Sequence, residues 1–186
     1  MDVTLRTQRL LLRPPRLTDA LNIARGLNNF AVAGNLARVP YPYREADAVA
    51  WVSSWRHDRP AEETGFAIDL PGQGVVGHCG FHRGDVGQAV LGYWLAEPFW
   101  NRGFMVEAAR EALDWFFAVA TLTSVESGVF HFNRASLAVQ RKLGFTEVGE
   151  SRVHCLARRE DLRHIDTRLT RAGWLERQGL RPRDVA

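Results

Sequence analysis

The segment 89–116, AVLGYWLAEPFWNRGFMVEAAREALDWF, carries the residue types best suited to hold an anion. A short turn with Asn101, Arg102 and Gly103 precedes a long helical pattern. The first turn of a helix leaves backbone N–H groups unpaired at the positive end of the helix dipole, which suits a phosphate. Gly103 permits close backbone approach, and Arg102 adds a positive charge. The segment predicts an anion site without the spacing of a Walker A loop or of the dinucleotide-binding glycine fingerprint.

This segment, through GYWLAEPFWNRGFMVEA, resembles the acyl-CoA motif of the GNAT N-acetyltransferase superfamily, and NRASLAVQRKLGF at 133–145 resembles a second signature of that family. The opening TQRLLLRPPRLTDA and the closing DTRLTRAGW are similar to the ends of its ribosomal-protein N-terminal acetyltransferase-like branch. The resemblance covers roughly residues 4–174, in the family's order. It implies acetyl-CoA as co-substrate, no metal, and acetyl transfer to an amine.

The resemblance also implies where each part of the cofactor binds. Pantetheine would enter a gap between two splayed strands, 89–96 and 124–132. Its arm would pair with backbone groups of Trp94, Leu95 and Ala96. The remaining cofactor-binding residues would form the turn and helix start that receive the pyrophosphate: Asn101, Arg102, Gly103, Phe104, Met105 and Val106.

Three residues near the second signature are the catalytic candidates. Asn133 would hold the cofactor or an ordered water, and Ser136 would lie beside the thioester or the departing thiol. Attack on a thioester needs a neutral amine, whereas an alkyl amine has a pKa near 10.4, so a base is required. His131 lies two residues before Asn133 and is expected to share its strand face, toward the gap. The alternatives are a structural or solvent-facing His131 and a helix-capping Ser136.

The sequence departs from the family pattern in three places, one of which is Phe132 and Arg134 in place of the acidic residue and proline usual beside Asn133 in this branch. The other two concern the cofactor and the catalytic acid. Met105 stands where the family has glycine or alanine, and its side chain would crowd the pyrophosphate unless it points away. Gln140 stands where many relatives have a general-acid tyrosine, and an amide cannot act as an acid. These departures favour, as an alternative of another class, a catalytically weakened CoA-binding or ribosome-associated module.

Hydrophobic periodicity predicts the elements that position these residues. A strand at 10–13 leads to a helix opened by Thr18 and Asp19, and a second helix runs from about Glu45 to Pro60. A three-strand antiparallel meander follows, with Val75, Gly77, Cys79 and Phe81 on one face of its middle strand. The remaining elements are a helix at 102–120, a strand at 124–132, a helix at 135–143 and two last strands at 146–157 and 165–171.

These elements predict one mixed α/β domain over residues 1–174, followed by a basic C-terminal tail, 175–186. The resemblance implies that this domain has the GNAT fold, with a mixed, mostly antiparallel sheet of about seven strands, about four helices and a splayed strand pair binding acyl-CoA. The chain has 186 residues, of which 46% are hydrophobic, so it can bury a sizeable core. Its net charge of +3 does not support specific DNA binding.

The sequence indicates the amine acceptor less closely than it indicates the cofactor. The branch suggests a protein N-terminal α-amine, such as that of a ribosomal protein, and small amines such as antibiotics or polyamines remain alternatives. We expect no membrane partner, because no apolar run reaches the roughly 18–20 residues that span a bilayer. Two cysteines, Cys79 and Cys155, build no disulfide framework, so we expect a cytoplasmic protein. A homodimer is left open.

Overall fold

The computed structural model describes residues 3–56 and 59–179. In that part of the chain, eight strands form one sheet in the order β1-β2-β3-β4-β5-β6-β8-β7. Neighbouring strands are antiparallel except for the parallel pair β5 and β6, as predicted for a mixed, mostly antiparallel sheet. The strands are β1 (Leu5–Arg6), β2 (Leu11–Arg13), β3 (Gly65–Leu70), β4 (Gly74–Arg83), β5 (Ala89–Leu95), β6 (Ser124–Phe130), β7 (Thr146–Cys155) and β8 (Glu160–Thr170).

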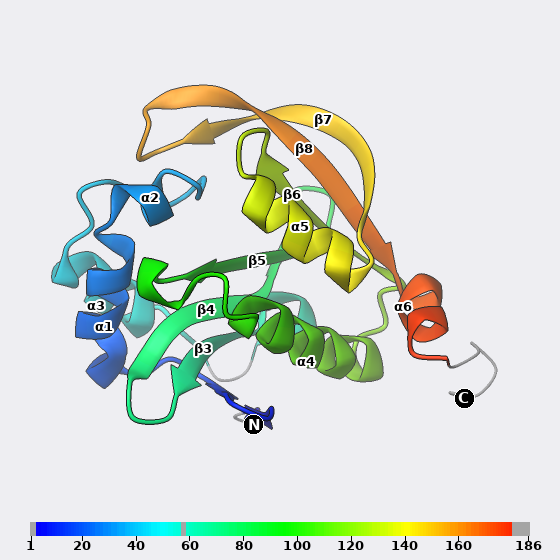
Figure 1. Cartoon of the computed structure of the whole chain (residues 1–186), viewed down its shortest axis with the longest axis horizontal. Coiled ribbons are helices and arrows are strands. Elements are labelled where there is room, and N and C mark those ends of the chain that lie inside the picture. Colours follow the sequence, from blue (N-terminus) through cyan, green and yellow to red (C-terminus); the bar gives the residue numbers. More distant parts are fainter. Residues whose placement is uncertain (1–2, 57–58, 180–186) are drawn as a thin grey trace.

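Helices cover both faces of this sheet (Figure 1). Six α-helices occur within the same residues: α1 (Ala20–Leu27), α2 (Phe30–Ala33), α3 (Glu45–Ser53), α4 (Phe104–Val119), α5 (Arg134–Leu143) and α6 (Arg171–Arg177). In Figure 1, α4 and α5 lie in front of the sheet, and α1, α2 and α3 gather at its left end. Among the described helices, none combines the length and apolar character needed to cross a bilayer.

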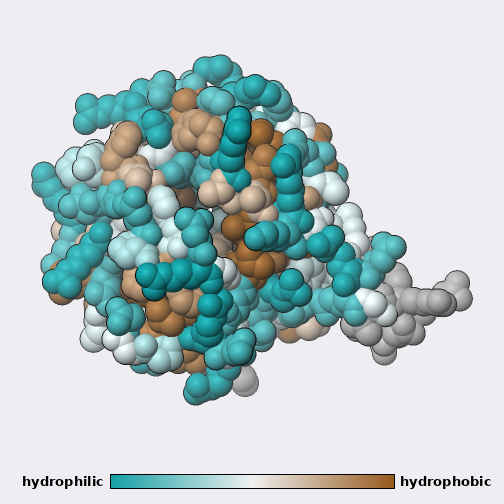
Figure 2. All heavy atoms as spheres, in the orientation of Figure 1, coloured by the Kyte–Doolittle hydropathy of each residue, from teal (hydrophilic) through white to brown (hydrophobic). Residues whose placement is uncertain are grey.

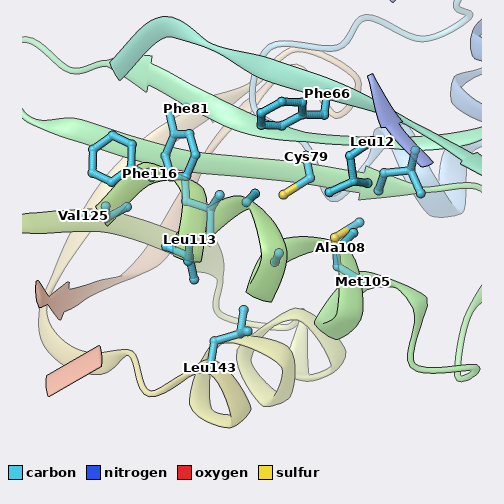
Figure 3. Packing of buried hydrophobic residues seen from close by; sticks show 14 of the residues in the cluster. Leu12, Phe66, Cys79, Phe81, Met105, Ala108, Leu113, Phe116, Val125 and Leu143 are labelled. Atoms are coloured by element: carbon cyan, nitrogen blue, oxygen red, sulfur yellow. The ribbon is translucent and has the colours of Figure 1, made fainter. Parts of the chain in front are cut away.

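Two apolar clusters hold the layers together. Alternate residues of β3 contribute to different clusters, since Phe66 and Ile68 pack in the larger one and Ala67 in the smaller. This separation follows from the two-residue period of a strand. The larger cluster joins the sheet to α4 through residues such as Leu113 and Phe116, both fully buried (Figure 3). The smaller cluster joins it to α1 and α3.

The helix that follows the predicted anion site forms as its pattern indicates. It begins after Gly103, whose φ of 78° is in the left-handed region that favours glycine. Ala109, Ala112, Leu113 and Phe116 all face the core with no exposed surface. The helix start is therefore fixed in place by burial of its apolar face.

Several element predictions need correction. The helix from Glu45 ends at Ser53 instead of continuing toward Pro60, and the hydroxyl of Ser54 donates to the carbonyl of Trp51. The short elements β1 and α2 were not predicted, because two and four residues are too few to display a period. The side chain of Asn29 caps α2 by accepting from the N–H of Ala31.

The predicted common face of the middle meander strand is also wrong at Val75. Ile68 pairs with Gly77 and Asp69 pairs with Val75, so the register skips Val76. A bulge of this kind moves the residues before it to the other face. Val75 accordingly packs with the α1 and α3 cluster, while Val76 and Cys79 pack with the α4 cluster.

The folded part continues past the expected boundary at Trp174. Helix α6 runs from Arg171 to Arg177 and was not predicted. Trp174 is 4% exposed, packs beside Phe117 and donates its indole N–H to Asp114 at 2.8 Å. Of the predicted basic tail, residues 180–186 lie outside the described residues.

Candidate active site

Strands β5 and β6 part soon after they meet. They share two ladder pairs, Ala89 with Val125 and Val90 with Glu126. Beyond these pairs each strand keeps its other neighbour, since β5 pairs with β4 as far as Leu95 and β6 pairs with β8 as far as Phe130. A last link, from the Ser127 hydroxyl to the Leu91 carbonyl at 2.9 Å, marks where the gap opens. The splayed pair that the family resemblance implied is present.

The N-terminus of α4 offers backbone N–H groups to an anion. Its N-cap residue is Gly103, which has no side chain to accept from the first turn. The preceding Asn101 also adopts a left-handed φ, of 60°, so the turn is tight. The first N–H groups of a helix without a capping side chain remain available to an outside acceptor. Phe104, Met105 and Val106, which follow Gly103, line the same groove as the gap.

Met105 does not crowd this helix start. Its side chain is 8% exposed and packs in the main core near Ala108 and Cys79 (Figure 3). The surface that the helix start presents is therefore mainly backbone, and the residues present fit a pyrophosphate. This removes one of the two reasons for expecting a weakened CoA site.

Arg9, which the sequence analysis did not single out, lies beside the helix start. Its guanidinium donates to the carbonyl of Arg102 at 3.0 Å and to Glu107 at 2.7 Å, and it lies over the ring of Phe104. Burial opposes ionisation of Glu107, yet hydrogen bonds from Thr7 and Arg9 leave its pKa lowered overall. Glu107 thus anchors the N-terminal segment to α4. No local pattern around Arg9 could reveal a contact made 98 residues away.

Ser136 is brought together with a tyrosine of β5. The hydroxyls of Tyr93 and Ser136 are 2.8 Å apart, and either can donate. Burial is the main cause that raises the pKa of Tyr93 to about 12, so Tyr93 stays protonated at neutral pH. Asn133, rather than Ser136, caps α5, because its side-chain oxygen accepts from the Ser136 N–H. The Ser136 hydroxyl therefore takes no part in capping α5.

Gln140, at the position of the family tyrosine, is a structural residue here. Its side chain is 1% exposed and donates to the Ser127 hydroxyl at 2.8 Å, while its oxygen accepts from the Thr167 hydroxyl at 2.8 Å. It therefore ties α5 to β6 and β8 beneath the gap. Tyr93 supplies, from another element, a phenolic hydroxyl next to Ser136. A tyrosine within the GYWLAEP motif is the signal that could have found it.

His131 does not share a strand face with Asn133. Strand β6 ends at Phe130, and a turn bond from the Asn133 N–H to the Phe130 carbonyl follows. The alternation of a strand therefore does not extend to these residues. His131 is exposed, lies 3.2 Å through Nδ1 from the Arg163 carbonyl, and is not among the residues that line the groove. Its role as a base stays a prediction without support from its position.

The backbone groups of Trp94, Leu95 and Ala96 lie along β5 and the turn that follows it. Two of them already have partners, since the Leu95 carbonyl accepts from the Trp100 indole and the Ala96 N–H donates to Val76. Their predicted pairing with a cofactor stays a prediction.

A groove of about 1990 Å³ runs past the start of α4 and the hydroxyls of Tyr93 and Ser136. This volume exceeds the roughly 300–1,000 Å³ of a typical single-ligand site, so two substrates can meet in it. Its lining includes Ser136, Tyr93 and Gly103, together with Trp51 and His78 on the side of α1 and α3. In the view of Figure 2, apolar side chains gather near the centre of the face and hydrophilic ones surround them.

Comparisons with known proteins agree with this geometry. The family model described as "Acetyltransferase (GNAT) domain" matches residues 9–146. The Bacillus subtilis protein named "Probable N-acetyltransferase YjcK" is 36% identical over 70 residues, which are 38% of this chain and 39% of that protein. The match thus spans less than half the length of each of these curated relatives.

Solved structures share the fold over most of the chain. RimJ of Mycobacterium smegmatis, in complex with a CoA-disulfide, has a TM-score of 0.72 at 23% identity and covers 91% of this chain and 86% of its own. The ribosomal-protein-S5-alanine acetyltransferase of Vibrio fischeri has a TM-score of 0.74 at 20% identity, with 93% of this chain and 99% of its own covered. At these identities the likeness concerns the fold, and the family match extends over most of the sequence. The chain belongs to the GNAT family of acetyltransferases.

Proposed function

We propose that this protein transfers the acetyl group of acetyl-CoA directly to a primary amine. The observation that carries the proposal is the gap between β5 and β6, which opens beside the uncapped N-terminus of α4. A pyrophosphate on the first turn of α4 would direct the rest of the cofactor into this gap. The thioester would then come near the hydroxyls of Tyr93 and Ser136, which can donate to the departing sulphur.

We further propose that the acceptor is the α-amine of a protein N-terminus, of the kind that ribosomal proteins present. Support comes from the fold shared with RimJ and with the ribosomal-protein-S5-alanine acetyltransferase. An α-amine has a pKa near 8, so a larger neutral fraction is available at neutral pH than for a lysine side chain. The groove extends to residues of α1 and α3, the side from which a chain terminus would enter.

An assay of CoA release tests both parts. The acceptors are peptides with free N-termini, the same peptides blocked at the α-amine but carrying lysine, a polyamine and an aminoglycoside. We expect CoA release with the free peptides and acetylation located by mass spectrometry at the α-amine. Turnover with the polyamine or aminoglycoside alone would replace the proposed acceptor by a small amine. CoA binding without turnover of any amine would leave a CoA-binding module and overturn the proposed activity.

A further inference from the structure

His164 of β8 pairs with Phe130 of β6, and its imidazole leans diagonally over Gly128, next to the point where β5 and β6 part. Gly128 directly follows Ser127, whose hydroxyl makes the last link to β5. A Cβ added to Gly128 would collide with Cε1 of His164, so the imidazole occupies the space that a side chain would take. The ring also contacts Phe130 edge to face, with centroids 5.7 Å apart. A glycine at this position thus lets a histidine reach the floor of the groove.

A carboxylate fixes the orientation of this histidine. Nδ1 of His164 lies 2.8 Å from Oδ1 of Asp166, two residues further along the same face of β8. The same oxygen accepts from the hydroxyl of Ser151, which lies opposite His164 on β7. An ionised carboxylate only accepts hydrogen bonds, so this contact favours, for the neutral imidazole, the tautomer with hydrogen on Nδ1 and the lone pair on Nε2.

The lone pair of Nε2 is available to the groove. His164 lines the groove with a side chain that is 20% exposed, and Nε2 has no hydrogen-bond partner within residues 3–56 and 59–179. Ser127 and Thr167, the neighbours of Gly128 and Asp166, turn to the opposite face and bind Gln140 of α5. His164 therefore faces the side away from α5, whereas Ser136 belongs to α5 itself. The basic nitrogen and the hydroxyl pair flank the gap from two sides.

We propose that His164 is the general base of the acetyl transfer, with Asp166 as the residue that positions it. This inference rests on the proposed N-acetyltransferase function and names the group that deprotonates the acceptor. An ammonium acceptor loses two protons on becoming an amide. His164 Nε2 takes the first and releases it to solvent. The carbon–nitrogen bond then forms as the carbon–sulphur bond breaks, and the second proton ends on the CoA sulphur.

The carboxylates around His164 each have a partner, whereas its Nε2 has none among the described residues. On β8 its carboxylate partner is Asp166. On β6 the nearest carboxylate along the same face is Glu126, which is bound to Arg168 at 2.8 Å. On β7, Glu150 is paired with Arg163. The Glu126 carboxylate is therefore already engaged with the guanidinium of Arg168.

Steady-state kinetics of His164→Asn, with acetyl-CoA and an acceptor that the wild type uses, test the proposal. We expect kcat to fall about 10²-fold or more, the scale of one lost base, with the KM for acetyl-CoA nearly unchanged. The loss of rate that the wild type shows on acidification should be absent in the variant. His154→Asn is the matched control, because His154 makes a similar 2.7 Å contact with Asp161 but is 55% exposed and does not line the groove.

A measurement on the resting protein keeps the inference testable apart from activity. ¹⁵N NMR of the imidazoles should find His164 as the Nδ1–H tautomer in the wild type and a mixture of tautomers in Asp166→Asn. An Nε2–H tautomer in the wild type would overturn the inference. So would wild-type kcat in His164→Asn, or a loss of rate confined to His131→Asn. A wild type that transfers acetyl to no amine would instead overturn the proposed function itself.

Discussion

At the scale of single residues, the contact between the hydroxyls of Tyr93 and Ser136 is the feature on which the proposed handling of the leaving group depends. Tyr93 remains protonated at neutral pH because burial raises its pKa to about 12. It can therefore donate to the oxygen of Ser136, which leaves the serine hydrogen free to point toward a departing thiolate. Under the proposed function, these two hydroxyls in series would take the role that the family resemblance assigns to a tyrosine at the position of Gln140.

Replacing Ser136 by alanine should reduce turnover more than stability. We expect kcat to fall about 10²-fold at constant acetyl-CoA affinity, because one proton donor is lost. Asn133→Ala is the comparison, since Asn133 is the residue that caps α5 and its loss should cost about 0.5–2 kcal/mol in unfolding free energy. Kinetics and urea unfolding of both variants measure the two effects. Normal turnover in Ser136→Ala would assign the serine a structural role.

At the scale of elements, the start of α4 depends on the left-handed backbone of Gly103. Gly103→Val should weaken acetyl-CoA binding about tenfold or more, a loss of at least roughly 1.4 kcal/mol, because a branched side chain at φ 78° distorts the N–H groups of the first turn. Gly72→Val is the matched control. Gly72 has a nearly identical φ of 79° but lies outside the groove, in the turn between β3 and β4.

Calorimetric titration of both variants with acetyl-CoA makes this measurement. Both substitutions should lower the melting temperature through backbone strain, and only Gly103→Val should also lower affinity. Equal affinities in the two variants would contradict a phosphate site at the start of α4.

The packing of β4 against α3 makes the fold sensitive to acid. His78 of β4 contacts the rings of both Trp51 and Trp55 edge to face, with centroids 5.1 and 5.9 Å away, and burial lowers its pKa to about 4. In the unfolded chain a histidine titrates near pH 6.5, so between pH 6.5 and 4 the unfolded state binds more protons than the folded state. Stability is therefore lost as the pH falls through this window.

Urea unfolding at pH 7 and pH 5 measures this contribution. Wild-type protein should lose about 2 kcal/mol through His78 between these values, from the difference between the two pKa values. His78→Phe should lack this part of the loss, and His78→Gln repeats the test if phenylalanine packs poorly. His82, whose pKa burial also lowers to about 4, remains in both variants and cancels in the comparison. An unchanged pH dependence in both variants would contradict the buried neutral histidine.

At the scale of the whole molecule, the sequence revealed what is encoded locally. Short stretches of sequence show the apolar period of α4, Gly103 directly before it, and Ser136 three residues after Asn133. The contact of Tyr93 with Ser136 spans 43 positions, and the placement of His164 over Gly128 depends on the register of β8 with β6. Local patterns do not encode such registers. The same limit explains why the bulge at Val76 escaped prediction.

The sheet consists of two parts joined at one narrow seam. Strands β1 to β5 and strands β6, β8 and β7 share the two ladder pairs of β5 and β6. The Ser127 and Tyr93 hydrogen bonds and the core beneath α4 and α5 complete the connection. A ligand that fills the gap would contact both parts. Binding is therefore expected to stabilise the whole fold.

Acetyl-CoA should raise the melting temperature in proportion to the logarithm of its concentration. At 100 times its Kd, mass action adds about 2.7 kcal/mol to the unfolding free energy, provided the unfolded chain does not bind it. For a domain of this size that corresponds to a rise of roughly 5–10 °C. Gly103→Val should show a smaller rise at the same concentration, while Gly72→Val should match the wild type. The absence of any rise with millimolar acetyl-CoA would contradict the cofactor site, because a gap that joins the two parts of the sheet cannot be filled without opposing their separation.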